Sequence, residues 1–312
     1  MEKIHILLSA DNKYAPWCGL TIRSIFKTTT HPVEIHIGSH QISPENKKKL
    51  LALSSKKVQI SIFEINEDDF KDCPVTERLP LGAYIRLFAS KMLPDISKIL
   101  YLDCDILVRH DLWELWCTDL SGYPMAAIPD INYLEMLPHF GFKDGFCINS
   151  GVLLMNLDFI RSHKILDLFL KTIQTKKHLI TCADQCVINM ALHNKILELP
   201  KKYNSHKYRD KNDVIVHFIW DKPWSEVNHF NKYQIQYLKL LIETPWKELW
   251  PKYKKLIFIT KFLFFYQRIK TQKTKKYKIF GITLIKKRMK KDKIWVYFLN
   301  IPVCIYKRKA RH

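Results

Sequence analysis

Short apolar runs alternate with segments of helical spacing along the first 65 residues. The runs that we interpret as buried strands are 4–8, 33–37 and 58–65. One helix is predicted to open at Pro16, and a second runs from Pro44, with Ser43 as its cap, to about Leu53. Strands that alternate with helices in this way predict a doubly wound α/β sheet.

The same alternation continues beyond residue 80. Helices are predicted at 81–92, 158–175 and 182–190, and strands at 98–103, 125–128, 152–157 and 214–219. A polar segment with a glycine, 149–151, precedes the 152–157 strand and is predicted to be a loop. The first strand, in turn, ends at a polar loop, 9–14, and a polar loop after the first strand is where α/β proteins bind ligands.

Two carboxylates stand at the end of one predicted strand, within the stretch from Lys98 to Val108. Because alternate side chains of a strand point to the same face, Asp103 and Asp105 are predicted to share a face. A divalent cation relieves the repulsion and desolvation of such a pair, and its open positions accept phosphate oxygens. The alternative is a solvated strand end with two exposed acids, because Asp-x-Asp is common by chance.

Other polar residues have a structural interpretation beside the functional one. Arg86 lies off the apolar face of its predicted helix, which by itself favours a surface salt bridge. Asp184 and Gln185 fall in the first turn of a predicted helix, where an acid often only complements the helix dipole. His217 lies near the end of the predicted 214–219 strand, and a histidine there is usually structural.

The net charge of +21 is concentrated at one end of the chain. Residues 247–312 hold 21 of the 51 Lys and Arg residues but only two of the 30 acids. We therefore predict a body, 1–246, and a basic, aromatic tail, 247–312, that seeks the phosphates of an anionic membrane or a nucleic acid. Two loosely repeated apolar stretches with basic flanks, 277–285 and 296–305, favour the membrane interface. A small packed hairpin with a solvated charged face is the alternative.

Several classes of protein are disfavoured. The longest apolar run, 256–266, is interrupted by Lys261 and is shorter than the roughly 18 residues that cross a bilayer. The N-terminus lacks the charged-then-apolar layout of a signal peptide, so we do not expect secretion. The eight cysteines form no Cys-x-x-Cys pair. We interpret them as reduced, buried thiols of a cytosolic protein rather than a disulfide or zinc framework.

Six motifs in one order make a specific signal. They are Ser9-Ala10-Asp11-Asn12-Lys13-Tyr14, Tyr84-Ile85-Arg86-Leu87, the stretch 101–108, the stretch 149–157, Asp184-Gln185, and His217 followed by Lys222-Pro223-Trp224. Together they resemble the family 8 glycosyltransferases, which include bacterial lipopolysaccharide galactosyl- and glucosyltransferases and, more distantly, glycogenin. The resemblance covers about residues 4–224. It implies an α/β protein of the GT-A fold, with a Rossmann-like mixed central sheet flanked by helices and, here, a basic C-terminal membrane-associating tail.

The resemblance also implies roles for individual residues. The implied metal ligands are Asp103, Asp105 and His217. The implied donor-binding residues are Ser9, Asp11, Asn12, Arg86, Asp103, Cys104, Asp130, Asn149, Asp184, Gln185 and Lys222. Among these, Asp184 and Gln185 are the implied catalytic residues beside the sugar, and Lys222 is the implied partner of the diphosphate.

The implied activity is Mn²⁺-dependent transfer of a hexose, galactose or glucose, from a UDP-hexose with retention of configuration; Mg²⁺ is a possible substitute. The expected acceptor is a lipopolysaccharide core, a lipooligosaccharide or another lipid-linked or surface glycan. The expected location is the cytoplasm, peripherally on the inner face of the plasma membrane, with an anionic membrane surface and no nucleic acid as partner.

Two residues depart from the family pattern. Lys13 stands where relatives commonly have another polar side chain, often Asn, and Trp220 stands where relatives usually have a glycine. The retained set of Asp103, Asp105 and His217 argues against a catalytically impaired family member that acts as a scaffold, but Trp220 keeps it among the alternatives. A non-enzymatic, basic nucleic-acid-binding protein is the other alternative, and it explains only the charge of the tail.

Overall fold

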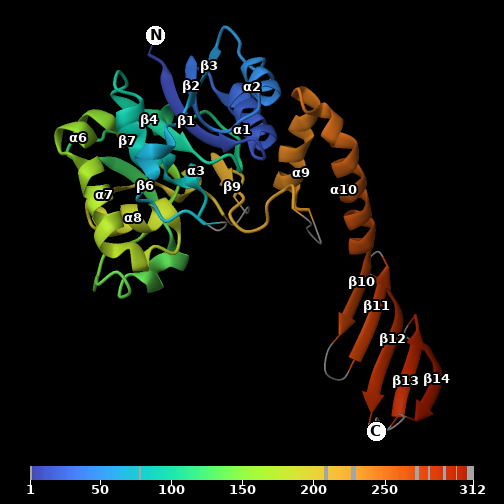
Figure 1. Cartoon of the computed structure of the whole chain (residues 1–312). Coiled ribbons are helices and arrows are strands. Elements are labelled where there is room, and N and C mark those ends of the chain that lie inside the picture. Colours follow the sequence, from blue (N-terminus) through green and yellow to red (C-terminus); the bar gives the residue numbers. More distant parts are fainter. Residues whose placement is uncertain are drawn as a thin grey trace.

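The structure is a computed structural model, shown in Figure 1. It describes residues 2–76, 79–206, 210–225, 230–270, 274–279, 282–290, 293–299 and 301–307. A mixed sheet of seven strands forms the centre of the body, as the resemblance implied. In spatial order its strands are β3 (Val58–Glu64), β2 (Val33–His40), β1 (Ile4–Asp11), β4 (Lys98–Leu102), β7 (Ile148–Asn156), β6 (Met125–Pro129) and β8 (Leu197–Glu198). Only β7 runs antiparallel to its neighbours.

The strand order reverses at β1, which pairs with β2 on one side and with β4 on the other. Both of these pairings are parallel, so the carboxyl ends of β1 and β4 lie at the same edge of the sheet. Connections leave such a reversal point toward opposite faces, and the crevice between them is where open α/β sheets bind ligands. The polar residues after β1 and β4 lie at this place.

Helices cover both faces of the sheet and give two hydrophobic cores. Ile6 and Leu8 of β1 belong to one core, together with α1 (Ala15–Thr28) and α2 (Pro44–Leu51), whereas Leu7 belongs to the other. This alternation follows from the period of two of a strand that is buried on both sides. The second core is closed by α6 (Leu157–Ser162), α7 (Ile165–Lys176) and α8 (Ala183–Ala191), which gather beside β6 and β7 in Figure 1.

The helix predicted at 81–92 is instead three short pieces: α3 (Leu81–Tyr84), the 3₁₀ turn η2 (Ile85–Phe88) and α4 (Ala89–Met92). The predicted loop at 149–151 is also wrong, because these residues belong to β7. The remaining short elements are η1 (Glu67–Phe70), α5 (Trp113–Trp116), η3 (Ile131–Met136), η4 (Lys177–Leu179) and η5 (Lys201–Tyr203).

A second, two-stranded antiparallel sheet crosses the edge of the body. Its strands are β5 (Ile106–Val108) and β9 (Ile215–His217), and their register places Ile106 opposite His217. This pairing joins segments more than a hundred residues apart. It therefore brings the late histidine beside the chain that follows Asp105.

The C-terminal part begins with α9 (Lys232–Lys239), η6 (Leu240–Glu243), η7 (Lys247–Leu249) and α10 (Trp250–Phe265). Tyr253 and Ile257 of α10 are buried in the first core, next to Trp246. Figure 1 shows α10 leading away from the body to five antiparallel strands. These are β10 (Tyr266–Lys270), β11 (Thr274–Ile279), β12 (Ile282–Lys290), β13 (Lys293–Phe298) and β14 (Ile301–Lys307). Across the described residues, no helix has both the length and the apolar character to span a membrane.

Candidate active site

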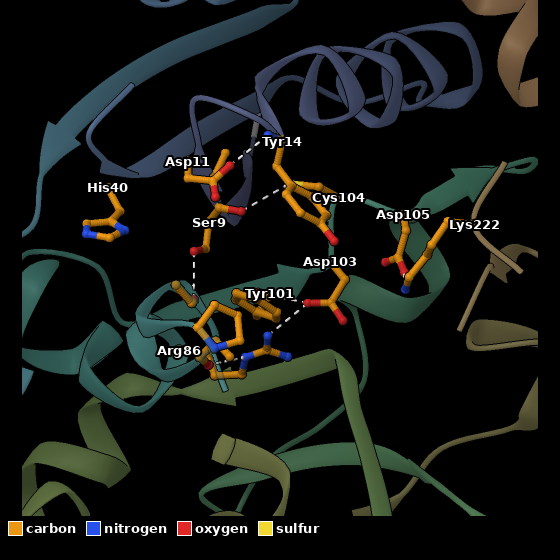
Figure 2. A pocket seen from close by; sticks show the side chains of 14 residues that line it. Ser9, Asp11, Tyr14, His40, Arg86, Tyr101, Asp103, Cys104, Asp105 and Lys222 are labelled. Atoms are coloured by element: carbon orange, nitrogen blue, oxygen red, sulfur yellow. Dashed lines mark hydrogen bonds and ion pairs between the residues drawn. The ribbon is translucent and has the colours of Figure 1, made fainter. Parts of the chain in front are cut away.

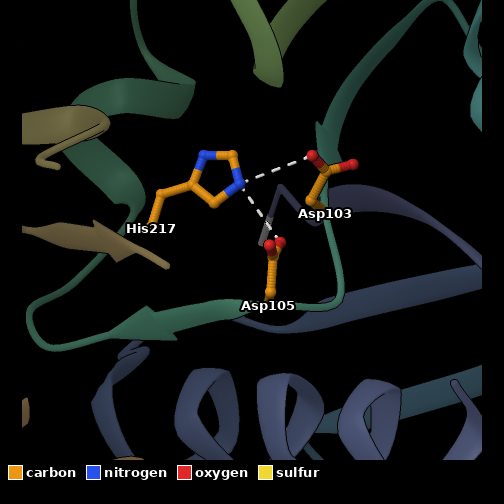
Figure 3. Close-up of side chains that lie close together, drawn as sticks. All are labelled: Asp103, Asp105 and His217. Carbon is orange, nitrogen blue, oxygen red and sulfur yellow. Dashed lines mark ion pairs between the residues drawn. The ribbon is translucent and has the colours of Figure 1, made fainter. Parts of the chain in front are cut away.

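Three potential metal ligands meet at the reversal point. Asp103 and Asp105 lie in a turn between β4 and β5, so the prediction that they share a face of one strand is wrong. The turn, rather than strand alternation, brings their carboxylates toward one ring, that of His217 (Figure 3). His217 Nε2 lies 3.1 Å from Asp105 Oδ1 and 3.5 Å from Asp103 Oδ2. One donor atom from each residue falls within 4.8 Å of the others.

The chemistry of this set fits a divalent cation. Asp105 and His217 are buried, whereas the Asp103 side chain is partly open to solvent. Burial alone would raise the pKa of Asp105, but His217 and Lys222 hold that pKa well below its usual range. Two carboxylate ligands and one imidazole suit Mn²⁺ better than Ca²⁺, which prefers oxygen alone.

Gly151 of β7 makes room for this arrangement. A Cβ atom at this position would lie 2.2 Å from Cε1 of His217 and 2.7 Å from Oδ2 of Asp103. Both separations are far below a van der Waals contact, so any larger residue would push the histidine or the carboxylate away. The glycine of the Asn-Ser-Gly motif is therefore required by close approach.

Arg86 is buried, which contradicts the surface salt bridge considered for it. Its Nη2 donates to Asp103 Oδ1 at 2.9 Å, its Nη1 donates to the carbonyl of Ser150 at 2.5 Å, and the guanidinium stacks 4.0 Å from the ring centroid of Tyr101. Burial would lower the pKa of Arg86, but Asp103 and Asp184 raise it further above its ordinary value. The arginine is thus a fixed positive charge behind the metal ligands.

Asp184 stands at the buried N-terminus of α8, and burial raises the pKa of its carboxyl to about 6 despite the nearby arginine. Its Oδ2 lies 3.1 Å from Arg86 Nε. That N–H donates to the carbonyl of Ala83, so the contact with Asp184 is electrostatic and supplies no hydrogen bond. A carboxylate desolvated in this way interacts strongly with any positive charge brought beside it.

Asp103 and Asp105 border a cavity of about 210 Å³, drawn in Figure 2. Its lining residues are Ser9, Ala10, Asp11, Tyr14, His40, Pro80, Gly82, Ala83, Arg86, Tyr101, Asp103, Cys104, Asp105 and Lys222. In the figure, Ser9 and Asp11 lie on one side, Arg86 on the opposite side, and Asp105 with Lys222 at the right-hand end. Seven residues predicted from the sequence therefore border one cavity.

The remaining predicted residues do not line it. Asn12 turns away, because its Oδ1 accepts hydrogen bonds from the Ser43 backbone at 3.0 Å and from Asn46 Nδ2 at 2.9 Å at the start of α2. Asp130 is buried at the end of β6, where its backbone N–H donates to the carbonyl of Cys147. The other four are not among the lining residues, although Asp184 contacts Arg86 and His217 contacts both Asp103 and Asp105. The last two, Asn149 and Gln185, are hydrogen-bonded to each other.

The strand-end residues of β1 are held by local hydrogen bonds. The Ser9 hydroxyl donates to the carbonyl of Gly82 at 2.7 Å, and Asp11 Oδ1 accepts from the Tyr14 backbone at 2.7 Å. The Cys104 thiol donates to the carbonyl of Ser9 at 3.1 Å, which ties the acidic turn to β1. These contacts fix the wall of the cavity opposite Arg86.

Lys222 reaches the cavity from the segment between β9 and α9 and forms an ion pair with Asp105. The segment is anchored by Trp224, whose ring stacks on Trp17 of α1 at 4.5 Å and meets Tyr14 edge-on at 5.7 Å. Trp220, three residues after His217, is 76% exposed and takes no part in this packing.

Sequence reasoning missed several contributors. Tyr101 donates its hydroxyl to Asp103 Oδ1 at 2.9 Å, and Asn204 lies 2.9 Å from Nδ1 of His217. Tyr101 falls inside an apolar strand, and Asn204 belongs to no motif that we recognised. The only sequence signal for the first was its place two residues before Asp103, and for the second there was none.

Open α/β sheets bind ligands at such a reversal point, and here a cluster of potential metal ligands lies at it. Comparison with known proteins specifies the class. The model of glycosyl transferase family 8 matches residues 5–228. The chain belongs to this family and is a glycosyltransferase.

Its similarity to individual proteins extends over most of the chain. A lipopolysaccharide 1,2-glucosyltransferase of Escherichia coli (strain K12) is 25% identical over 281 residues, 82% of each chain. A lipopolysaccharide 1,3-galactosyltransferase of Salmonella typhimurium is 24% identical over 270 residues, 78% of this chain and 80% of that protein. The galactosyltransferase LgtC, crystallised with donor and acceptor sugar analogues, has the same fold, with a TM-score of 0.70 at 23% identity over 78% of this chain and 96% of that one.

Proposed function

We propose that the protein transfers galactose or glucose from a UDP-hexose to a surface-glycan acceptor, with Mn²⁺ as cofactor and with retention of configuration. The observation that carries the proposal is the convergence of Asp103, Asp105 and His217. Two of these residues, Asp103 and Asp105, border the same cavity as Lys222 and Ser9. A diphosphate needs a cation and a fixed positive charge on neighbouring oxygens, and this end of the cavity offers residues for both.

The proposed division of the donor between the two walls is the one that the family resemblance implies. Ser9 and Asp11 would contact the uridine part, with the Cys104 backbone near the ribose, and Lys222 would contact the diphosphate. Bound Mn²⁺ supplies charge stabilisation as the diphosphate departs. Lys222 adds an ammonium group where that negative charge develops, at a place already fixed by the Trp224 anchor.

The buried side of the site is suited to the sugar. As the bond to the diphosphate breaks, the sugar gains positive charge, which ionised Asp184 favours electrostatically. Gln185 lies next to it on α8, but an amide is a poor nucleophile. We therefore favour attack by the acceptor from the leaving-group face, with an oxygen of the departing phosphate accepting the proton of the acceptor hydroxyl. A sugar trapped covalently on any side chain would contradict this route.

Two separate observations support the proposed class of acceptor. Curated relatives over most of the chain carry names of lipopolysaccharide glucosyl- and galactosyltransferases. The basic tail, 247–312, suits a peripheral position on the anionic inner face of the plasma membrane, where a lipid-carried acceptor would be within reach. We accordingly propose a lipopolysaccharide-core or related lipid-linked acceptor.

A hydrolysis screen tests the donor and the metal. The full chain would be incubated with UDP-glucose and UDP-galactose, with and without Mn²⁺, beside an Asp103→Asn variant that keeps the side-chain shape. We expect Mn²⁺-dependent release of UDP from one donor, reduced by about 100-fold or more in the variant because a first ligand is lost. No Mn²⁺-dependent turnover of either donor would contradict the proposal and favour an impaired family member that acts as a scaffold.

A further inference from the structure

A hydrogen-bonded file, or row, of three side-chain amides connects Gln185 to the cluster of potential metal ligands. Gln185 Oε1 accepts from Asn149 Nδ2 at 3.1 Å and from the Ser150 backbone at 3.2 Å. Asn149 Oδ1 accepts from Asn204 Nδ2 at 2.8 Å and from the Gly151 backbone at 3.1 Å. Asn204 Oδ1 then lies 2.9 Å from Nδ1 of His217 and 3.1 Å from Nε2 of His206. The file crosses from α8 through β7 to the segment after η5.

Only one orientation of each amide satisfies all of these contacts. The backbone N–H groups of Ser150 and Gly151 can only donate, so oxygens of Gln185 and Asn149 must face them. Asn204 must then present its Nδ2 to Asn149 Oδ1, because two oxygens would otherwise meet. Its Oδ1 is left to face the two histidines. Every link is set by the one before it.

The last link fixes the tautomer of the histidine. Because an amide oxygen only accepts, the proton of neutral His217 lies on Nδ1. Its Nε2 faces Asp103 Oδ2 and Asp105 Oδ1 at 3.5 and 3.1 Å, where a protonated Nε2 pairs with the carboxylates. When a cation displaces that proton, the ring keeps its Nδ1 proton and offers the Nε2 lone pair to the cation. A metal ligand needs this tautomer, and hydrogen bonds to the second nitrogen usually orient such ligands.

The inference rests on the proposed function, because it assumes a metal at His217 and a sugar near Gln185. We propose that Asn204 is a positioning residue that holds His217 in its metal-binding tautomer and, through Asn149, holds the Gln185 amide toward the sugar. Asn204, Asn149 and His217 are all buried, so water does not readily replace a lost partner. In the part of the chain that the structure describes, the Gln185 side chain forms hydrogen bonds only through Oε1.

Two substitutions separate the two tasks. Asn204→Leu removes both contacts, so Mn²⁺ binding should weaken by roughly 10- to 100-fold and kcat should fall. Asn204→Asp keeps an acceptor for His217 but sets a carboxylate oxygen against Asn149 Oδ1. Asn149 then either keeps this repulsion or flips, and a flip loses the Gly151 N–H and turns an oxygen toward Gln185. For this variant we expect Mn²⁺ affinity within about threefold of the unaltered protein, or tighter, and kcat lower by roughly 10-fold.

The measurements are Mn²⁺ titration followed by electron paramagnetic resonance, which needs no turnover, and UDP-hexose hydrolysis at saturating Mn²⁺. Asn212→Leu and Asn212→Asp, at an exposed asparagine, are the matched controls and should leave both readouts unchanged. A thermal melt checks folding. If Asn204→Leu does not fold, Asn204→Asp decides alone.

Unaltered Mn²⁺ affinity in Asn204→Leu, unaltered kcat in Asn204→Asp, or loss of Mn²⁺ binding in Asn204→Asp would each overturn the inference while the proposed function stands. The proposed function fails separately, and the inference with it, if the unaltered protein neither binds Mn²⁺ nor hydrolyses a UDP-hexose.

Discussion

Gly151 is the residue whose size is most tightly constrained by the site. The Cβ of Gly151→Ala would overlap both His217 and Asp103, so we expect Mn²⁺ affinity and Mn²⁺-dependent hydrolysis to fall by at least about 10-fold. Gly122→Ala is the control, because its Cβ meets nothing within 4 Å although its φ of +81° strains any other residue. That control should cost about 1 kcal/mol of stability without weakening Mn²⁺ binding. If Mn²⁺ affinity falls equally in Gly151→Ala and Gly122→Ala, the effect at Gly151 is general destabilisation rather than overlap with the metal ligands.

Asp184 makes a prediction about pH. Its folded-state pKa is raised to about 6, whereas an aspartate in an unfolded chain titrates near 3.9. The folded protein therefore holds this proton more tightly than the unfolded chain. The resulting contribution to stability is fully present below about pH 4 and is lost as the pH rises through about 6.

Asp184→Asn removes this titration while keeping the shape of the side chain. The free energy of unfolding of the variant, relative to the unaltered protein, should rise by up to about 3 kcal/mol between pH 4 and pH 7. Urea unfolding of both metal-free proteins at several pH values measures the difference. A difference that stays constant with pH would show that the Asp184 carboxyl is not shifted upward.

The sequence predicted the important side chains better than their geometry. Asp103 and Asp105 were assigned from their spacing, but a turn brings them together, and composition does not distinguish a turn from a strand end. Asn204 could not be predicted, because its partners Asn149 and His217 lie 55 residues before it and 13 residues after it. A role defined by partners at these separations becomes visible only in the folded chain.

At the scale of elements, strands buried on both faces were the easiest to predict. The short apolar runs of β1, β2 and β3 predict buried strands directly. Each observed strand differs from its predicted range at the C-terminal end. The 81–92 segment was harder, because helical spacing does not reveal that the middle turn is a 3₁₀ turn. That turn carries Arg86, which contacts β7 and the acidic turn rather than solvent.

The segment between β9 and α9 carries Lys222, and Trp224 attaches it to α1. Trp224→Ala should cost roughly 2 kcal/mol of stability through the lost stack on Trp17 and should raise KM for the UDP-hexose, because Lys222 loses its fixed position. Mn²⁺ affinity should change little, since the three potential ligands lie outside this segment. Steady-state kinetics and Mn²⁺ titration measure the two effects.

Trp220 is the matched control in the same segment. Because 76% of it is exposed, Trp220→Ala should change the free energy of unfolding by no more than about 0.5 kcal/mol. If Trp224→Ala is as stable as Trp220→Ala, the aromatic stack does not hold the segment. If Trp224→Ala weakens Mn²⁺ binding as strongly as it weakens donor binding, the segment supports the metal ligands as well.

At the scale of the whole molecule, the charge and the catalytic site occupy different parts of the chain. The body carries the cavity, and residues 261–312 carry 17 Lys and Arg residues against one acid. The predicted boundary after Trp246 falls inside a packed region, because Tyr253 and Ile257 are buried beside it. An experiment on the tail must therefore cut beyond these residues.

A chain that ends at Thr260 keeps this core and loses most of the charge. We expect the full chain to sediment with vesicles containing anionic lipid at low salt and to be released as salt rises, because the attraction is electrostatic. The Thr260-ended chain should stay in solution while it keeps its melting temperature and UDP-hexose hydrolysis. A chain that ends at Trp246 should lose on the order of 3 kcal/mol of stability, since two buried side chains are removed.

The comparison separates attachment from folding. If the Thr260-ended chain still sediments with the vesicles, the attachment lies in the body and the tail proposal fails. If the full chain is retained by DNA or RNA more strongly than by vesicles at matched salt, the basic tail serves nucleic acid instead. If neither outcome occurs, the Thr260-ended chain should lose transfer to a vesicle-borne acceptor but keep hydrolysis. That result would make the tail the element that brings the catalytic body to its lipid-carried substrate, because only the encounter with the membrane has changed.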